Sequence, residues 1–229
     1  MDQALELADM ISARKSTSLT TIVSEELENL ILSGYLKPGQ RLNEMHLAEK
    51  FNVSRGIIRE ARRGLERAGL VTSIPNRGVF VKKVTREEYV ENSEVRALMT
   101  GFLCSKAAEN AKQRDKAELQ QHLIEMGDAF KRDDADAYFH LNVAFHELIS
   151  KIANHQRAGA IYRDLVRDSL LARKYLLQGA VVMSKSHEEH KEIVAAIVAN
   201  DQARAYQAGL EHTSKGLSRW LKMQSNPSD

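Results

Sequence analysis

The chain has 229 residues, of which 43% are hydrophobic and 28% are charged, with only three prolines and one cysteine. This composition is that of a folded protein of one or two domains and excludes disordered and fibrous proteins. The longest apolar run, Ile193 to Ala199, is far shorter than the roughly 20 residues that span a membrane. Because Cys104 is alone and the first fifteen residues do not resemble a secretory signal, the sequence predicts a cytoplasmic protein with no membrane contact.

Basic side chains are concentrated in one part of the chain. Residues 50–83 contain nine Lys and Arg and two Glu, although the net charge of the whole chain is only +2. Such a segment favours contact with a polyanion, whereas a basic helix without further context is more often a solvated surface. The elements that carry these charges decide between the two interpretations.

The pattern of the first 83 residues predicts helices, a tight turn and a hairpin. Apolar spacing and capping residues place the helices at 20–33, 44–51 and 55–68, with N-caps at Asn43 and Ser54 and with Gly69 ending the third helix. Strands are expected at 70–74 and 79–81. This order is typical of a winged helix-turn-helix, here over residues 17–83, after an N-terminal extension of residues 1–16.

The predicted recognition helix begins with groups suited to DNA. Arg55 and Arg59 are one turn apart, and each guanidinium can bind a guanine or a phosphate. Gly56 allows close approach to the DNA backbone, and the helix N-terminus with Ser54 offers amides to a phosphate. A winged helix that contacts only protein is the alternative. The candidate DNA-binding residues, including those at the hairpin tip, are Ser54, Arg55, Gly56, Arg59, Arg62, Arg77 and Gly78.

The run PGQRLNEMHLAEKFNVSRGIIREARRGLERAGLV, followed by PNRGVFV, resembles the N-terminal domain of GntR-type bacterial transcription regulators. By position, the DNA-contacting residues of that family fall on Arg55, Arg59 and Gly78. Arg62 stands where the family usually has Leu, and this arginine would add a contact to the DNA backbone. Met45 stands where an Arg or polar residue often contacts phosphate, which would remove one.

Residues 84–229 contain no strand pattern. Helices are expected at about 85–111, 113–131, 133–153, 156–178, 184–199 and 202–222, with Ser184 and Asp201 as N-caps of the last two. The predicted fold is therefore mainly α: the winged helix-turn-helix is followed by an all-α bundle of six to seven helices over residues 84–229.

Three histidines of this second part are expected to face the bundle interior. Asn142 and His146 share one helix face, His190 lines up with apolar residues on another helix, and His212 lies between Gly209 and Gly216, which leaves space around its ring. Three imidazoles and an amide oxygen from three helices suit a divalent transition metal. Alternatively, each histidine is a hydrogen-bonded core residue.

The segments LNVAFHELI, EEHKEIVAAIVANDQARA and GLEHTSKGL resemble the FCD-type ligand-binding domain of the FadR subfamily of GntR regulators. The resemblance implies that Asn142, His146, His190 and His212 bind a metal, often zinc, which in turn holds a carboxylate effector. Many members have Asp where this chain has Asn142, so the site is less anionic here, and nickel, manganese and iron stay open. Arg96 and Arg173 are candidate anchors for the effector, or else surface ion pairs.

The sequence thus predicts a transcription regulator, a repressor, which binds double-stranded pseudo-palindromic operator DNA as a homodimer and responds to a small carboxylate. The self-complementary surface would include the first bundle helix near Val95, Leu98 and Phe102. The alternative is a metal-dependent hydrolase fused to a DNA-binding domain. Its candidate bases, Glu147, Glu188 and Glu189, fall on or near helix surfaces by periodicity.

Overall fold

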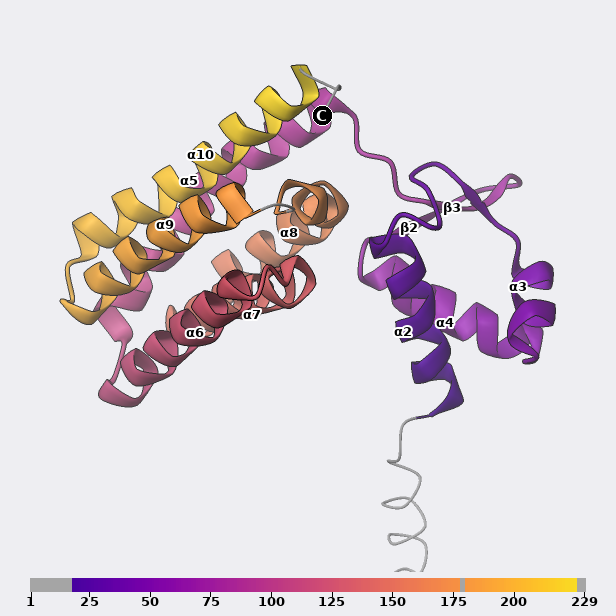
Figure 1. Cartoon of the computed structure of the whole chain (residues 1–229), viewed down its shortest axis with the longest axis horizontal. Coiled ribbons are helices and arrows are strands. Elements are labelled where there is room, and N and C mark those ends of the chain that lie inside the picture. Colours follow the sequence, from indigo (N-terminus) through magenta and orange to yellow (C-terminus); the bar gives the residue numbers. More distant parts are fainter. Residues whose placement is uncertain (1–17, 178–179, 226–229) are drawn as a thin grey trace, which may run out of the picture. The chain divides into compact units, whose positions relative to one another are not determined.

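The computed structural model describes residues 18–177 and 180–225, and the chain divides into two compact units between Lys83 and Val84 (Figure 1). Residues 1–16, predicted as an extension, lie outside the described part. The elements of the first unit are α2 (Leu19–Leu32), β1 (Arg41–Leu42), α3 (Glu44–Phe51), α4 (Arg55–Arg67), β2 (Val71–Ile74) and β3 (Gly78–Val81).

Side-chain caps determine where the helices of the first unit begin. The Asn43 side chain accepts hydrogen bonds from two backbone amides at the start of α3, and Ser54 Oγ accepts one from Ile57 N at the start of α4. Both caps were predicted from the sequence and are confirmed. Gly69 follows α4 with φ +73°, a left-handed conformation that glycine adopts at low cost. Apolar side chains of α2 and α4 form the core of this unit: Val23, Leu27, Ile31, Ile58, Ala61 and Leu65.

The sheet of this unit has three antiparallel strands in the order β1-β3-β2. β2 and β3 form the predicted hairpin, in which Ile74 pairs with Gly78. β1 was not predicted, because it has only two residues and no alternation can be seen in so short a segment. It pairs Arg41 with Phe80 and Leu42 with Val79, and so fixes the segment before α3 against the wing.

The second unit consists of helices, and its described residues form no strand. Together with the winged first unit, this confirms the predicted fold class. None of the described helices is long and apolar enough to cross a membrane. The helices are α5 (Arg86–Asn110), α6 (Gln113–Lys131), α7 (Ala135–Ile152), α8 (Gln156–Leu176), α9 (Ala180–Val198) and α10 (Gln202–Ser225).

One predicted helix start in this unit is wrong and another is confirmed. α9 begins at Ala180, four residues before the expected N-cap Ser184, because the preceding Val and Met residues continue the helix and Met183 is fully buried. At the start of α10, Asp201 Oδ1 accepts a hydrogen bond from Arg204 N at 3.0 Å, so Asp201 has the predicted capping role.

Helices α5 and α10 lie side by side in close contact (Figure 1). A Cβ atom added at Gly209 would lie 2.7 Å from Cys104 Sγ and 3.0 Å from Thr100 O, and one added at Gly101 would lie 2.8 Å from Tyr206 O. The expectation that Gly209 leaves space for His212 is therefore wrong, since that space is filled by α5. Gly216 does face open space, because an added Cβ would meet nothing nearer than 3.9 Å.

Candidate functional site

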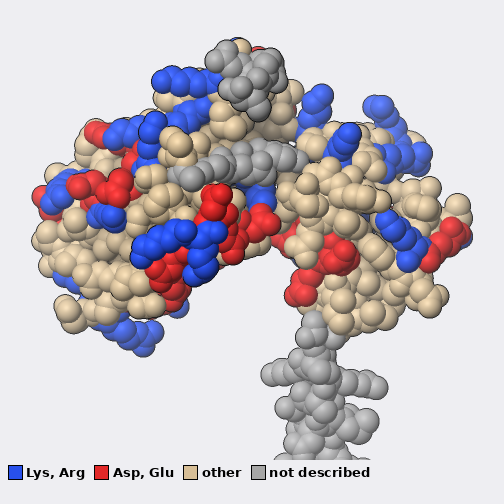
Figure 2. Space-filling view, viewed as in Figure 1, with Lys and Arg blue, Asp and Glu red and all other residues tan. Residues whose placement is uncertain are grey.

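The N-terminus of α4 and the wing border an open hollow of about 700 Å³ on the first unit. Its lining includes Arg55 and Arg59 from α4 and Gly78 from β3, which the sequence singled out. Ser54 and Gly56 lie exposed at the start of α4. Figure 2 shows basic side chains on the side of this unit that carries α3 and β3. Arg77 is exposed in the turn between β2 and β3.

Arg62 is placed differently from the other candidates. Its side chain is only 19% exposed, and its Nε lies 3.1 Å from Glu44 Oε1. Arg62 Nη1 also donates to Glu66 Oε2 at 3.3 Å and to Ser73 Oγ at 2.7 Å. Arg62 therefore joins α4 to α3 and β2, and these partners would have to be given up for a DNA contact.

Arg41 lines the same hollow, although sequence reasoning did not single it out. Its side chain is exposed, and its Nε would lie 3.0 Å from a Cβ added at Gly78. Gly78 has φ +107°, so both the backbone conformation and this close approach favour glycine. The sequence signal was Arg41 in the turn motif PGQRL, but its position beside the wing depends on the pairing of β1 with β3.

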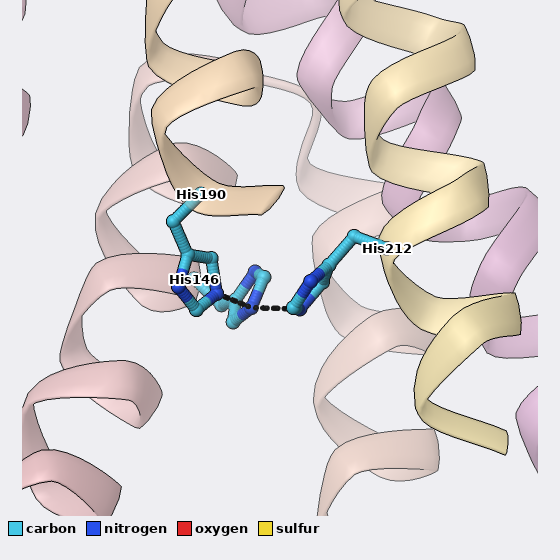
Figure 3. A group of neighbouring side chains, drawn as sticks. All are labelled: His146, His190 and His212. Atoms are coloured by element: carbon cyan, nitrogen blue, oxygen red, sulfur yellow. Dashed lines mark hydrogen bonds between the residues drawn. The ribbon is translucent and has the colours of Figure 1, made fainter. Parts of the chain in front are cut away.

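The three predicted interior histidines meet in the second unit. His146 extends from α7, His190 from α9 and His212 from α10, and their rings point toward one another (Figure 3). His146 Nε2 lies 3.2 Å from His212 Nε2 and 3.3 Å from His190 Nε2. One ligand atom from each ring lies within 4.8 Å of the other two.

Glu189 contacts this cluster through His212, and its position differs from the one predicted. Periodicity placed Glu189 on or near a helix surface, but its side chain is only 14% exposed and lies against α10. Glu189 Oε2 is 2.9 Å from His212 Nδ1, and Arg219 Nη1 and Nη2 donate to the two carboxylate oxygens at 2.6 Å and 2.9 Å. Burial raises the pKa of Glu189, but the hydrogen bonds and the charges of His212 and Arg219 outweigh this effect and lower the pKa to about 2. The carboxylate is therefore ionised and accepts a hydrogen bond from His212 Nδ1–H.

Hydrogen bonding alone does not account for the histidine cluster. Because His212 Nδ1 donates to Glu189, His212 Nε2 carries a lone pair, and the contact with His146 needs a proton on His146 Nε2. The contact between His190 Nε2 and His146 Nε2 must then share this one His146 proton, or else place a second proton, on His190 Nε2, directly against it. One cation bound by three lone pairs removes this conflict, and a carboxylate on the outer nitrogen is typical of a metal-bound histidine.

Burial keeps these imidazoles neutral, which is the state that binds metals. Burial lowers the pKa of His146 and of His190 well below 6.5, and the charges of neighbouring histidines and of Arg173 lower both further. Burial also lowers the pKa of His212, although Glu189 opposes this effect. The residues present therefore fit a divalent transition metal.

A small cavity of about 40 Å³ lies beside the cluster. His146 and His212 line it together with Asn142, which is only 2% exposed and shares a face of α7 with His146. Arg96 and Arg173 also line the cavity and are each 6% exposed, so neither is the surface residue of the alternative interpretation. Three of the four predicted ligands and both predicted anchors thus line one cavity, and the fourth ligand, His190, contacts His146 beside it.

Comparisons with known proteins agree with both units. The gntR family of bacterial regulatory proteins matches residues 19–81, and the FCD domain matches residues 91–215. The HTH-type transcriptional regulator LutR of Bacillus subtilis (strain 168) is 30% identical over 206 residues, which cover 80% of this chain and 92% of that protein. The gluconate operon transcriptional repressor of Bacillus licheniformis is 29% identical over 184 residues, 80% of this chain and 73% of that protein.

A solved structure supports the same fold. E. coli McbR/YncC is similar with a TM-score of 0.75 at 23% identity, and the match covers 90% of this chain and 99% of the other. The FCD match alone spans more than half of the chain, and the gntR match covers the winged unit that precedes it. The chain therefore belongs to the GntR family of bacterial transcription regulators, in the FadR-type branch that carries an FCD domain.

Proposed function

We propose that this regulator is a repressor whose affinity for operator DNA changes when a small carboxylate binds at a metal in the helical bundle. The observation that carries the proposal is the convergence of three imidazole nitrogens, from buried His146 and His190 and half-buried His212, beside a cavity lined by arginines. The gluconate operon relative of Bacillus licheniformis, 29% identical over 184 residues, is named as a repressor. The protein would act in the cytoplasm, where operator DNA is found.

His146, His190 and His212 would bind the metal, with the Asn142 side-chain oxygen as a neutral fourth ligand. Imidazole nitrogens suit zinc, nickel and iron, whereas manganese prefers oxygen ligands such as the amide of Asn142. Because three of the four proposed ligands are imidazoles, we place zinc first. When bound, the metal supplies a Lewis-acidic cation that attracts a carboxylate. Arg96 and Arg173, which line the same cavity, would hold the effector.

The DNA-binding half of the proposal rests on the hollow between α4 and the wing. Arg55 and Arg59 would contact base edges or phosphates at the N-terminus of the recognition helix, and Arg41 would contact the DNA backbone beside Gly78. Arg41 thus supplies a basic group close to Met45, where many family members have an Arg or polar residue. Ser54 and Gly56 offer backbone amides, and Arg77 extends the wing.

A homodimer is part of this proposal, because one winged helix reads only a few base pairs and useful affinity needs two copies on a pseudo-palindromic operator. Val95 and Leu98 on α5 are 47% and 54% exposed, which suits a self-complementary apolar surface. Phe102 is half-buried and packs edge-on against His155, so it would contribute less. Light scattering of the purified protein measures the mass directly.

The hydrolase alternative finds little support around the cavity. Glu189 is engaged by His212 and Arg219, while Glu188 pairs with Lys191 at 2.7 Å on the surface. Glu147 is exposed on α7 and lines a different depression. Among the described residues, no free carboxylate lies where a general base would be needed.

The test is to replace His146 with Ala and to measure metal content, operator affinity and effector response separately. Metal content and effector response should be lost, whereas operator affinity should stay within about threefold, because the winged unit is a separate compact unit. His140→Ala is the matched control, since His140 is exposed on the same helix. Full metal content together with a normal response in His146→Ala would overturn the proposal.

A further inference from the structure

Two arginines of the bundle cavity have no acidic partner in the part of the chain that the structure describes. Arg96 Nη2 donates to Ser93 Oγ at 3.3 Å, but Arg96 Nε and Arg173 Nη1 have no hydrogen-bond partner among the described residues. A guanidinium stays protonated at physiological pH, and a buried charge without a counter-charge strongly destabilises a fold. This part of the cavity therefore requires an anion.

The cavity itself supplies no free negative charge. Of the three arginines that line it, only Arg219 has a carboxylate partner, Glu189. Its described lining contains neither Asp nor Glu, and the hydroxyl of Tyr89, another lining residue, also has no hydrogen-bond partner. A bound ligand can satisfy both guanidiniums and this hydroxyl together.

The arginines and the histidine cluster act on the same space. His146 and His212 line the cavity together with Arg96 and Arg173, so the imidazoles and the guanidiniums face the same small volume. Asn142 is neutral, so it adds no negative charge on the histidine side either. Neither the histidines nor Asn142 therefore supplies a negative charge that could neutralise the two arginines.

The size of the cavity limits the ligand. A volume of about 40 Å³ corresponds to roughly three or four water positions, since about 10–15 Å³ holds one water. A short acid fits such a space with small side-chain movements, whereas a long acyl chain does not.

We infer that the ligand of this cavity is a short-chain dicarboxylate, with one carboxylate at the histidine cluster and the other held between Arg96 and Arg173. The inference rests on the proposed function, in which the metal takes the first carboxylate. A monocarboxylate would leave the two guanidiniums without a counter-charge, whereas a second carboxylate accepts hydrogen bonds from both.

The experiment is calorimetric titration of the full-length protein, zinc-loaded and metal-free, with succinate, butyrate and inorganic phosphate. Succinate and butyrate have the same number of carbons and differ by one carboxylate. Succinate should bind the zinc-loaded protein at least about tenfold more tightly than butyrate, because charge-assisted hydrogen bonds to the second carboxylate are added. Equal affinity for the two acids overturns the inference. Phosphate that binds as tightly as succinate overturns the dicarboxylate class.

Substitutions assign the preference to the arginines. Arg173→Gln should make succinate and butyrate bind alike, and it should raise the melting temperature of the ligand-free protein because an unpaired buried charge is removed. Arg96→Gln is a second variant with the same expected loss of preference. Arg157→Gln, at an exposed position of α8, should leave the preference unchanged. A preference for succinate that persists in both variants contradicts the inference.

Operator binding, measured separately, distinguishes this inference from the proposed function. If succinate binds through the arginines and operator affinity does not change, the proposed function fails and the ligand class stands. If butyrate alone changes operator affinity, the proposed function stands and the ligand class fails.

Discussion

Arg59 has a partner in the free protein that it would exchange for DNA. Its Nε lies 3.3 Å from Glu44 Oε2, and its side chain is 65% exposed. An exposed ion pair of this kind contributes at most about 1 kcal/mol, so little is lost when a phosphate or a guanine replaces the carboxylate. Arg41 and Arg55 are exposed without a described acidic partner, so the three guanidiniums are available along the hollow.

We predict that Arg59→Ala weakens operator binding by about 1–3 kcal/mol and relaxes sequence preference, as expected for a base contact. Arg41→Ala should instead weaken binding equally on all sequences and reduce the salt dependence, as expected for a phosphate contact. Fluorescence anisotropy with operator and scrambled duplexes at several salt concentrations measures both effects. Arg67→Ala, exposed at the other end of α4, serves as the control. Unchanged affinity in Arg59→Ala would remove this helix from the interface.

Single residues also show what periodicity can and cannot predict. The inward positions of Asn142, His146 and His190 follow from helix geometry, because each shares a face with apolar residues. Glu189 was missed because it lies next to His190 in the sequence, which turns it away from that face and toward α10. Its role depends on Arg219 and His212 of another helix, and no pattern within α9 contains that information.

At the level of elements, the contact between α5 and α10 depends on small residues. Gly209 allows the two backbones to approach, and neither Cys104 nor the Thr100 carbonyl can move away easily, because both lie in the buried core. Gly216 is on the same helix without such a neighbour. Because both glycines are helical, the gain in helix propensity on substitution by Ala is the same for both.

We therefore predict that Gly209→Ala is less stable than Gly216→Ala by about 1–3 kcal/mol, the usual cost of overpacking a core. Urea unfolding of the two variants gives this difference directly. Equal midpoints for the two variants would show that α5 and α10 are not in close contact.

The elements differ in how far the sequence predicted them. Caps and apolar spacing gave α3 and α4 to within a residue, and all six bundle helices were expected. The start of α9 was missed because a serine inside a helix looks like a serine that begins one. β1 was missed because two residues become a strand only when a partner such as β3 is present.

At the level of the whole molecule, the buried histidines link stability to pH. In the folded, metal-free protein the pKa values of His146, His190 and His212 are lowered, so these rings stay neutral below pH 6.5. In the unfolded chain they take up protons near pH 6.5. Because the unfolded state then binds more protons, the free energy of unfolding falls as the pH falls below about 6.5 and is unaffected above it.

We predict that the urea midpoint of the metal-free protein decreases from pH 7 to pH 5.5, and that the decrease is smaller in His190→Gln. His140→Gln, at an exposed position, should behave like the unsubstituted protein. Glu189 affects stability in a lower pH range. Because folding lowers its pKa from 4.5 to about 2, the stability that its ionised form contributes is lost only as the pH falls below about 4.5. A midpoint that rises toward pH 5.5 would contradict the assignment of neutral histidines.

The carboxylate of Glu189 has a consequence for how a cation would enter the bundle. Through Glu189, the residue before His190, α9 is joined to His212 and Arg219 of α10, so two of the three histidine-bearing helices are linked without any ion. Preorganised ligands lose little conformational entropy on binding, which favours affinity. His146 and Asn142 come from α7, to which Glu189 makes no described hydrogen bond. An incoming ion would therefore meet α9 and α10 already joined, with His146 Nε2 of α7 3.3 Å and 3.2 Å from their histidine nitrogens.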